Sequence, residues 1–288
     1  MSVPVAGRRG ARADDTCAVL LAWNDAPRVL GLLDALEACD PRPGHVVVVD
    51  NGSRDDTASR VRERWPGHDL VLLGENLGFA AAVNRGLERA IAAEARFAWI
   101  LNTDLELPPS ALGALRAAAE REPRTGLVSA VLLEADGRVQ ARGGGRVNLW
   151  TGASRHVVAP GEDCHYMTGA CLLLRTGMLR EVGLFDEGYF FYWEDVDLGF
   201  RAREAGWTMA VAEDCRVVHH EGSSLGRWSE ERWFHLFRGM RRFLHARSPV
   251  PRVATATRLL HHSAAMLRHG RHAALRGAWR GAFAGRAS

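Results

Sequence analysis

The sequence predicts an α/β fold: a mostly parallel sheet flanked by helices, with a basic helical extension at the C-terminus. Short apolar stretches alternate with helical patterns between residues 16 and 133, and polar side chains follow the ends of these stretches. Such alternation is typical of a parallel sheet with helices on both faces. The extension is predicted by charge, because twelve Arg and no acidic residue follow Glu231.

The apolar stretches have the length and β-branched character of buried strands. We expect strands at residues 16–23, 45–50, 69–73, 96–101 and 126–133. Pro27 opens a helical pattern after the first strand. Ser53 followed by Asp56 resembles a capping box and predicts that the next helix begins at Ser53. Further helices are expected after Asn76 and after Pro108.

The pattern loosens between residues 134 and 163, where glycines indicate loops or a hairpin that we expect to be mobile or to face an acceptor. A strand and a helix return over residues 166–183, and one or two short strands end at His219 and His220. Helical patterns follow at residues 229–247 and 252–268. The second has an apolar stripe at helical spacing, formed by Val253, Ala256, Leu260, Ala264 and Leu267.

Composition sets the class of protein. The 288 residues are 47% hydrophobic and 25% charged, which is ordinary for one large domain with an extension. We expect a disordered N-terminus at 1–14, a catalytic domain at 15–228 and a basic extension at 229–288. No apolar run reaches the ~18 residues of a membrane span, and the first residues do not read as a secretory signal. Five cysteines without metal-finger spacing predict a reduced, cytoplasmic protein.

Sequence signatures of several enzyme classes are absent. There is no GxGxxG at the first strand–helix turn, no GxxxxGK[ST] and no GxSxG. These absences disfavour a dinucleotide-binding dehydrogenase, a P-loop enzyme and an α/β-hydrolase.

Polar residues at the expected strand ends are candidates for a binding site, because parallel sheets bind ligands at the carboxyl ends of their strands. Asp50 can accept hydrogen bonds from a nucleobase or ribose, although Asp-Asn-Gly is equally natural as a turn. Asn102, Asp104 and Glu106 alternate, so two or three oxygens can face one side. Oxygen ligands of this kind suit Mg²⁺ or Mn²⁺ bridged to phosphates, and the alternative is a helix cap before Pro108.

The segment FFYWEDVDLGFRAREAG, residues 190–206, joins an aromatic run to an acidic cluster at an expected helix start. A carboxylate at Glu194 or Asp195, beside aromatic side chains that exclude water, has the character of a general base. The simpler interpretation is that an acid at a helix N-terminus stabilises that helix. His219 and His220 end a strand and either complete a metal shell or are structural.

Five motifs taken together resemble the family 2 glycosyltransferases, in particular the bacterial rhamnosyltransferase-like members. They are VDNGS, NLGFAAAVNRG, LNTD, FFYWEDVDLGFR and VVHHEGSS, and they occur in the family's order over about residues 16–224. The resemblance implies a GT-A fold, a nucleotide-diphosphate sugar donor, a divalent metal (Mg or Mn) and inversion at the anomeric carbon.

The resemblance also implies roles for individual residues. Asp195 would be the catalytic base with Glu194 beside it, and Asp104 would hold the metal with His219 or His220. The implied donor-binding residues are Trp23, Asn24, Asp50, Asn76, Asn84, Asn102 and Asp104. Two departures stand out: the first strand ends AWND where the family commonly has NYN, and NTD replaces DxD.

The expected reaction is the transfer of a sugar to a hydroxyl of a glycan or polyprenyl-diphosphate-linked acceptor. The best candidate for the sugar is L-rhamnose, from the donor dTDP-rhamnose. The alternatives are a UDP-hexose or UDP-galactofuranose transferase of the same fold, or a nucleotide-sugar-binding module without turnover. The basic extension suits an anionic membrane surface at the inner face of the cell membrane, or is a helical cap with a solvated face. No motif supports a nucleic-acid partner.

Overall fold

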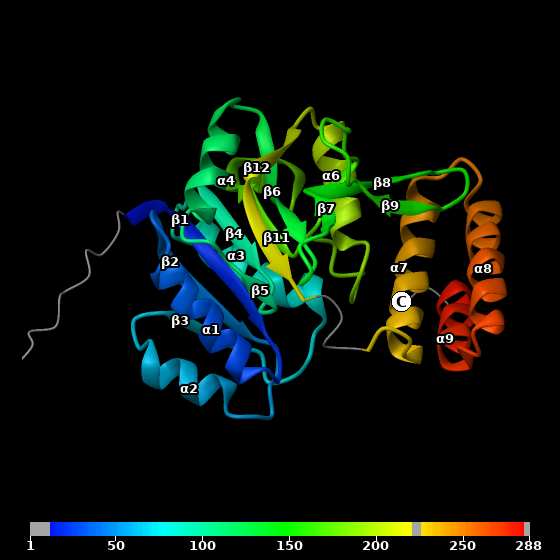
Figure 1. Ribbon diagram of the computed structural model, residues 1–288, viewed down its shortest axis with the longest axis horizontal. Coiled ribbons are helices and arrows are strands. Elements are labelled where there is room, and N and C mark those ends of the chain that lie inside the picture. Colours follow the sequence, from blue (N-terminus) through cyan, green and yellow to red (C-terminus); the bar gives the residue numbers. More distant parts are fainter. Residues whose placement is uncertain (1–11, 221–225, 285–288) are drawn as a thin grey trace, which may run out of the picture.

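The computed structural model describes residues 12–220 and 226–284, which form a sheet flanked by helices and a C-terminal group of helices beside it (Figure 1). Part of the expected disordered N-terminus, residues 1–11, lies outside the described residues, as do residues 221–224 of the VVHHEGSS motif. The first strand begins at Arg12, so residues 12–14 are strand and the predicted boundary at residue 14 is wrong.

The main sheet confirms the predicted mostly parallel arrangement. In the described part of the chain its strand order is β3 (Asp69–Leu72), β2 (Arg42–Asp50), β1 (Arg12–Ala22), β4 (Phe97–Leu101), β11 (Cys171–Arg175), β6 (Thr125–Leu133), β12 (Thr208–His219) and β5 (Leu105–Glu106). β7 (Val139–Arg142) pairs with β6. β11 is antiparallel to both neighbours, and β5 and β7 are also antiparallel to their partners.

Helices cover both faces of this sheet. α1 (Ala26–Glu37), α2 (Thr57–Arg64) and α4 (Ala111–Glu120) share one hydrophobic core with alternate strand residues. α3 (Phe79–Ala92), α5 (Thr176–Val182) and α6 (Glu194–Glu204) share the core on the other face. The capping-box prediction is wrong, because α2 begins at Thr57 and the Ser53 hydroxyl instead accepts a hydrogen bond from the Asn24 N–H at 2.9 Å.

The loosely patterned region forms a hairpin, as one of the two predicted possibilities. β8 (Gly144–Val147) pairs with β9 (Ser154–His156) on one side and with β10 (Tyr166–Met167) on the other. The hairpin projects from the main sheet toward the C-terminal helices (Figure 1). Gly144 permits this pairing, because a side chain there would collide with the β10 backbone.

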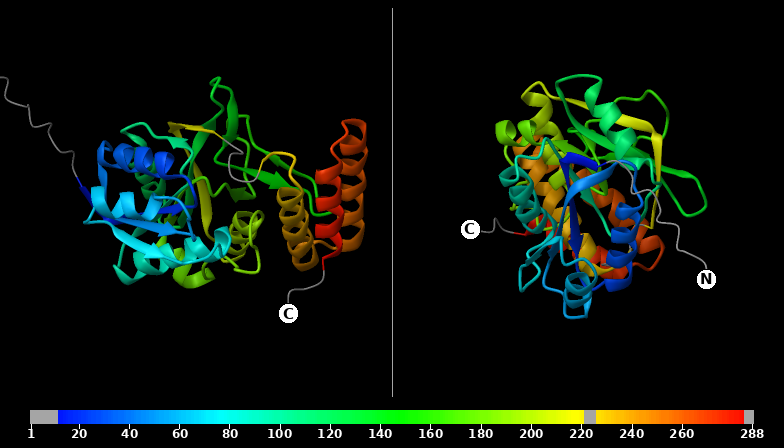
Figure 2. Two further views of the ribbon diagram at one scale, coloured as in Figure 1. Left: turned by 90° about the horizontal axis from the view of Figure 1, so that it is seen from below. Right: turned by 90° about the vertical axis from the view of Figure 1, so that its left-hand side faces the viewer.

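The C-terminal extension consists of α7 (Glu230–Arg247), α8 (Pro251–Arg268) and α9 (His272–Phe283), grouped at one end of the molecule (Figure 2). The predicted apolar side of α7 is buried in a third core together with Trp193 of the aromatic run. Gly239 permits this contact, since a Cβ there would lie 2.6 Å from the Tyr192 carbonyl oxygen. Among residues 12–220 and 226–284, no helix combines the length and apolar character needed to cross a bilayer.

Candidate functional site

The carboxyl ends of the central strands open onto a cleft with two adjoining parts. The larger part, about 310 Å³, lies among the ends of β4 and β12, the hairpin, α6 and α7. The smaller part, about 110 Å³, lies at the ends of β1 and β2 and against the aromatic run. Phe79, Asn102, Asp104 and Phe191 line both parts, so Asp104 stands where they meet.

The structure brings Asp104 and Asp195 to the same cleft, although they are far apart in the sequence. Both line its larger part, together with Glu194 and His219. Asp104 follows β4, and Asp195 is in the first turn of α6. A backbone bond ties the start of α3 to the aromatic run that precedes Asp195, because the Phe79 N–H donates to the Phe190 carbonyl at 2.7 Å.

The acidic pair is held by unusual backbone geometry. Tyr192 and Trp193 both have positive φ, at 70° and 76°. Consecutive left-handed residues with bulky side chains are strained, and such strain is concentrated at functional sites. The turn directs Asp195 toward the cleft, where its Oδ1 accepts from the Val196 N–H at 2.8 Å and its Oδ2 from the Gly169 N–H at 3.2 Å.

Burial governs the protonation of this pair. Burial raises the pKa of Asp195 above its usual value, and the two N–H donors and nearby His156 only partly oppose that effect. Burial raises the pKa of Glu194 further, and the negative charge of Asp195 adds to it. Glu194 Oε2 is buried and has no hydrogen-bond partner among the described residues. Of the two carboxyl groups, Glu194 therefore keeps its proton to higher pH, because it lacks the N–H donors that favour the charged form of Asp195.

Asp104 and His219 form the second polar group of the cleft. His219 Nε2 lies 3.4 Å from Asp104 Oδ1. His219 Nδ1 lies 2.7 Å from the side-chain oxygen of Gln140, and an amide oxygen only accepts, so Nδ1 carries the proton. In the neutral imidazole, Nε2 then has a free lone pair that faces a carboxylate oxygen. Asp104 Oδ1 is buried and has no hydrogen-bond partner among the described residues.

These two acceptors fit a divalent cation. An imidazole nitrogen and a carboxylate oxygen that face each other at 3.4 Å are both types of group that ligate divalent cations. Within residues 12–220 and 226–284, no group of three or more His, Cys, Asp or Glu side chains is arranged around a metal position. Mg²⁺ typically takes few protein ligands and completes its shell with water and substrate phosphates, so two protein ligands are compatible with it.

The structure distinguishes the two adjacent histidines. His219 is buried at the end of β12 and faces Asp104, whereas His220 Nε2 lies 2.7 Å from Glu106 Oε1 at the surface. Side chains alternate along a strand, so consecutive residues face opposite sides. Of Asn102, Asp104 and Glu106, two line the cleft, which is within the expected two or three; Glu106 does not line it and contacts His220 instead.

The smaller part of the cleft contains several predicted donor-binding residues. Trp23, Asn76 and Asn102 line it. Asn51, which the sequence analysis did not single out, also lines it and ties the ends of two strands together. Its side-chain N–H donates to the Asn76 oxygen at 3.0 Å, and its oxygen accepts from the Leu77 N–H at 2.9 Å.

Three predicted donor-binding residues do not line either part of the cleft. Asn24 is exposed and accepts from the Arg54 N–H at 2.7 Å, which ties the end of β1 to the loop after β2. Asp50 is buried; its Oδ1 holds the following turn through the N–H groups of Gly52 and Ser53, while its Oδ2 has no hydrogen-bond partner among the described residues.

Asn84 is the third of these residues, and it braces the acidic segment from behind. Its amide N–H donates to the Phe185 carbonyl at 2.9 Å, and its oxygen accepts from the Phe185 N–H at 3.1 Å. A second contact joins the amide to Glu187 at 3.1 Å. These bonds fix the chain that leads into the aromatic run, so Asn84 supports the cleft without lining it.

Sequence reasoning missed further cleft residues besides Asn51. Gln140 comes from β7 and His156 from the hairpin, and Glu231 and Arg232 come from the first turn of α7. Gln140 and His156 lie in a stretch without clear periodicity, so only its expected acceptor-facing position pointed to them. The α7 residues lie at the start of a helix that the sequence analysis treated as an extension separate from the catalytic domain.

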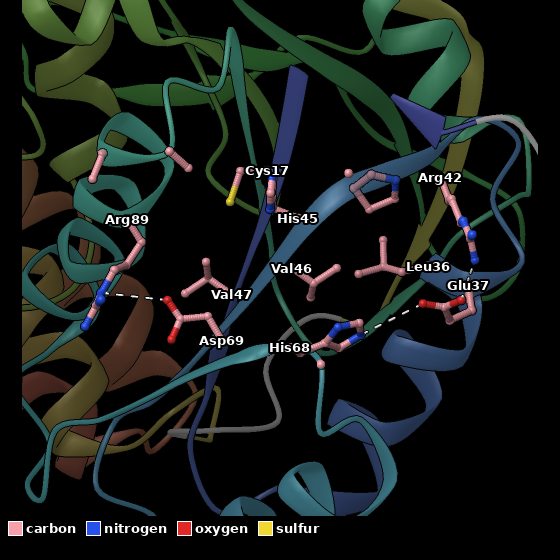
Figure 3. Close-up of a pocket in the computed structure, with 15 residues that line it drawn as sticks. Cys17, Leu36, Glu37, Arg42, His45, Val46, Val47, His68, Asp69 and Arg89 are labelled. Atoms are coloured by element: carbon pink, nitrogen blue, oxygen red, sulfur yellow. Dashed lines mark hydrogen bonds and ion pairs between the residues drawn. The ribbon is translucent and has the colours of Figure 1, made fainter. Parts of the chain in front are cut away.

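Another hollow lies away from the cleft. It measures about 540 Å³ and lies at the amino ends of β2 and β3, where Cys17, His68 and Arg89 are among its lining residues (Figure 3). Its charged groups pair with one another, as in Arg89 with Asp69 at 3.8 Å. It contains none of the predicted site residues, and it lies at the amino ends of the strands, whereas the cleft lies at their carboxyl ends.

Comparison with known proteins identifies the family. The model of the glycosyltransferase-like family 2 matches residues 14–244, which includes both parts of the cleft and most of α7. The chain belongs to this family. It is 34% identical over 236 residues to the N-acetylglucosaminyl-diphospho-decaprenol L-rhamnosyltransferase of Mycobacterium tuberculosis, covering 73% of this chain and 77% of the relative. It is also 28% identical to the O-antigen biosynthesis protein RfbC of Myxococcus xanthus, covering 74% of this chain and 18% of that protein.

Solved structures confirm the GT-A type of fold for this glycosyltransferase. The mannosyltransferase PcManGT of Pyrobaculum calidifontis, in complex with GDP-Man and Mn²⁺, has a TM-score of 0.59 at 20% identity. The similarity covers 93% of this chain and 73% of that one. GalNAc-T7 with UDP, GalNAc and Mn²⁺ has a TM-score of 0.64 at 14% identity, over 83% of this chain and 48% of that one. The predictions of family, fold class and enzyme are thereby confirmed.

Proposed function

We propose that this glycosyltransferase moves L-rhamnose from dTDP-rhamnose to a hydroxyl of a lipid-linked acceptor, with inversion at the anomeric carbon. The observation that carries the mechanism is that Asp104 and Asp195 line one cleft. The choice of sugar and acceptor is supported by the M. tuberculosis relative, whose name specifies rhamnose transfer to N-acetylglucosaminyl-diphospho-decaprenol.

Asp195 acts as the general base in this proposal. The acceptor oxygen attacks C1 of the sugar while its proton passes to the Asp195 carboxylate, and the bond from C1 to the donor phosphate breaks with its electron pair leaving on dTDP. The N–H groups of Gly169 and Val196 orient the carboxylate toward the cleft. A proton on Glu194, which its burial favours, would avoid two adjacent buried carboxylates that are both ionised.

The junction of the cleft would hold the diphosphate of the donor. Asp104 and His219 would hold a divalent cation, Mg²⁺ or Mn²⁺, which supplies positive charge against the charge on the leaving diphosphate. Gln140 keeps the proton of His219 on Nδ1, so that Nε2 presents its lone pair. Trp23, Asn76 and their neighbours in the smaller part of the cleft would bind the nucleotide.

The larger part of the cleft would take the acceptor. Arg232, at the start of α7, lines it and provides positive charge for an acceptor diphosphate. Its guanidinium stacks on the Tyr192 ring at 5.4 Å from the centroid, which orients it beside the acidic pair. His156 and Ser154 of the hairpin line the same part and offer hydrogen bonds to an acceptor sugar.

Asp195→Asn tests the assignment of the base. The variant keeps the size and one carbonyl oxygen but cannot accept the proton, so we expect transfer to fall by roughly 10²- to 10⁴-fold. Donor affinity, measured by calorimetric titration with dTDP-rhamnose or dTDP in the presence of Mn²⁺, should stay close to wild type. Asp163→Asn is the matched control, because that carboxylate is exposed and lies outside the cleft. Equal losses of transfer and donor affinity in Asp195→Asn would refute the role.

A further inference from the structure

The apolar stripe of α8 faces outward. Val253, Leu260 and Leu267 are 61%, 62% and 57% exposed. The opposite side of the helix, with Ala254 and Leu259, is buried against the other C-terminal helices. The stripe at helical spacing that the sequence shows is therefore not the face that packs on the protein, and α8 has apolar side chains on two sides.

A further exposed apolar side chain lies near the start of the helix. Trp150 at the tip of the β8–β9 hairpin is 64% exposed. Its loop packs on the start of α8, because the Ser248 hydroxyl donates to the Leu149 carbonyl at 2.6 Å and a Cβ on Gly152 would lie 3.3 Å from the Ala254 oxygen. Trp150 thus lies at the end of α8 where Val253 begins the stripe. An exposed apolar surface of this extent on a globular protein indicates a binding surface.

The charge around this face is positive. Arg252 and Arg268 are exposed at the two ends of α8, and neither forms an ion pair with any residue in the described ranges. No acidic residue follows Glu231 in the sequence, so α8 and α9 contain no negative side chain. A partner for this face must accept apolar side chains in its centre and guanidinium groups at its rim.

We propose that this α8 face, defined by Val253, Leu260, Leu267 and Trp150 with Arg252 and Arg268 at its ends, docks on the surface of an anionic lipid bilayer. Amphipathic helices with basic flanks bind such surfaces by inserting their apolar side chains between headgroups. A second copy of the chain is disfavoured, because two-fold pairing of one acid-free face brings arginines against arginines. The outward position of α8 leaves this face accessible (Figures 1 and 2).

α7 packs between α8 and the cleft, to which it contributes Arg232 and Leu236. The inference does not depend on the sugar or on the identity of the acceptor, since it stands on the exposure and charge of α8 alone.

Vesicle flotation of the full-length chain tests the proposal. The probes are phosphatidylcholine vesicles with about 30% phosphatidylglycerol and vesicles of phosphatidylcholine alone. The variant Leu260→Gln/Leu267→Gln removes apolar side chains that support no core. The matched control is Leu72→Gln/Val158→Gln, which removes equally exposed apolar side chains, 53% and 52%, on other elements.

We expect wild type and control to float with the anionic vesicles and the α8 variant to lose at least about tenfold in its partition coefficient. Both variants should melt like wild type and show wild-type transfer to a water-soluble acceptor analogue. Equal flotation of the two variants, or of wild type with both kinds of vesicle, would overturn the proposal. So would a wild-type dimer that the α8 variant abolishes without any vesicle binding.

Discussion

Gln140 is the residue through which the cation site can be tested without relying on turnover. It accepts the Nδ1 proton of His219 at 2.7 Å and thereby fixes the imidazole tautomer and ring orientation toward Asp104. Gln140→Leu removes that acceptor while keeping a side chain of similar length. His219 then exchanges between tautomers and rotamers, and only part of the population presents a lone pair on Nε2.

The loss of a hydrogen-bonding partner behind a ligating histidine typically lowers metal affinity by about 10- to 100-fold. At 1.4 kcal/mol for each factor of ten, this corresponds to about 1.4–2.8 kcal/mol of binding free energy. Gln140 is only partly buried, so we expect the thermal midpoint of the variant to change little. The assay is Mn²⁺ titration by electron paramagnetic resonance in the presence of saturating dTDP.

Gln140→Glu is the matched control, because a carboxylate also accepts the Nδ1 proton and should keep Mn²⁺ binding close to wild type. A Gln140→Leu variant that binds Mn²⁺ with wild-type affinity would refute the tautomer argument. If Asp104→Asn also binds normally, the cation is not held at this junction at all.

Three further changes test other parts of the structure. Because burial raises the pKa of Glu194 in the folded protein, its contribution to stability is present below its unfolded pKa of about 4.5 and is lost as the pH rises. In urea titrations, the free energy of unfolding of Glu194→Gln should therefore fall less than that of wild type between about pH 5 and pH 8. Parallel profiles would contradict this. Asn84→Ala leaves the buried N–H and C=O of Phe185 without partners and should destabilise by about 2–5 kcal/mol at unchanged donor affinity, so loss of donor affinity alone would restore a direct binding role. Gly239→Ala should cost about 1–3 kcal/mol and lower transfer by displacing α7, whereas Gly31→Ala, with open space around it, should be neutral or stabilising; equal effects would contradict the close packing.

The fold was largely predictable because the strands have both faces buried and polar residues at one end. Continuous apolar runs placed the strands β1, β2, β4 and β6 within a few residues. The carboxyl ends of β1, β2 and β4 meet at the cleft, as expected for parallel strands. The insertion of β11 between β4 and β6 was not predictable from the local pattern. A short apolar strand looks the same whether its neighbours run parallel or antiparallel.

Candidate site residues could be predicted where the residue type itself indicates a chemical role, as for acids and histidines at strand or helix ends. They could not be predicted where the role depends on contacts made only in the folded structure. Asp104, Asp195 and His219 were found from strand and helix ends and lie in the cleft. The role of Gln140 could not be predicted, because an isolated glutamine in a glycine-rich stretch indicates no function. Only the folded structure shows that β7 brings it to His219 at the end of β12.

Asn84 and the apolar stripe of α8 are two further cases in which a sequence pattern did not predict the surroundings of a side chain. Asn84 belongs to a motif associated with donor binding, yet both of its amide atoms are used by the backbone of Phe185. The stripe of α8 has the spacing of a core-facing helix, yet Leu260 points to solvent. Periodicity gives the angle between side chains on a helix but not the direction of the protein. That direction depends on which of the two apolar faces packs on the larger apolar surface, and in α8 the face with Leu259 packs on α7 and α9. The outer face with Leu260 stays exposed and α8 itself has no acidic residue, and these two observations favour the anionic bilayer proposed above as its partner.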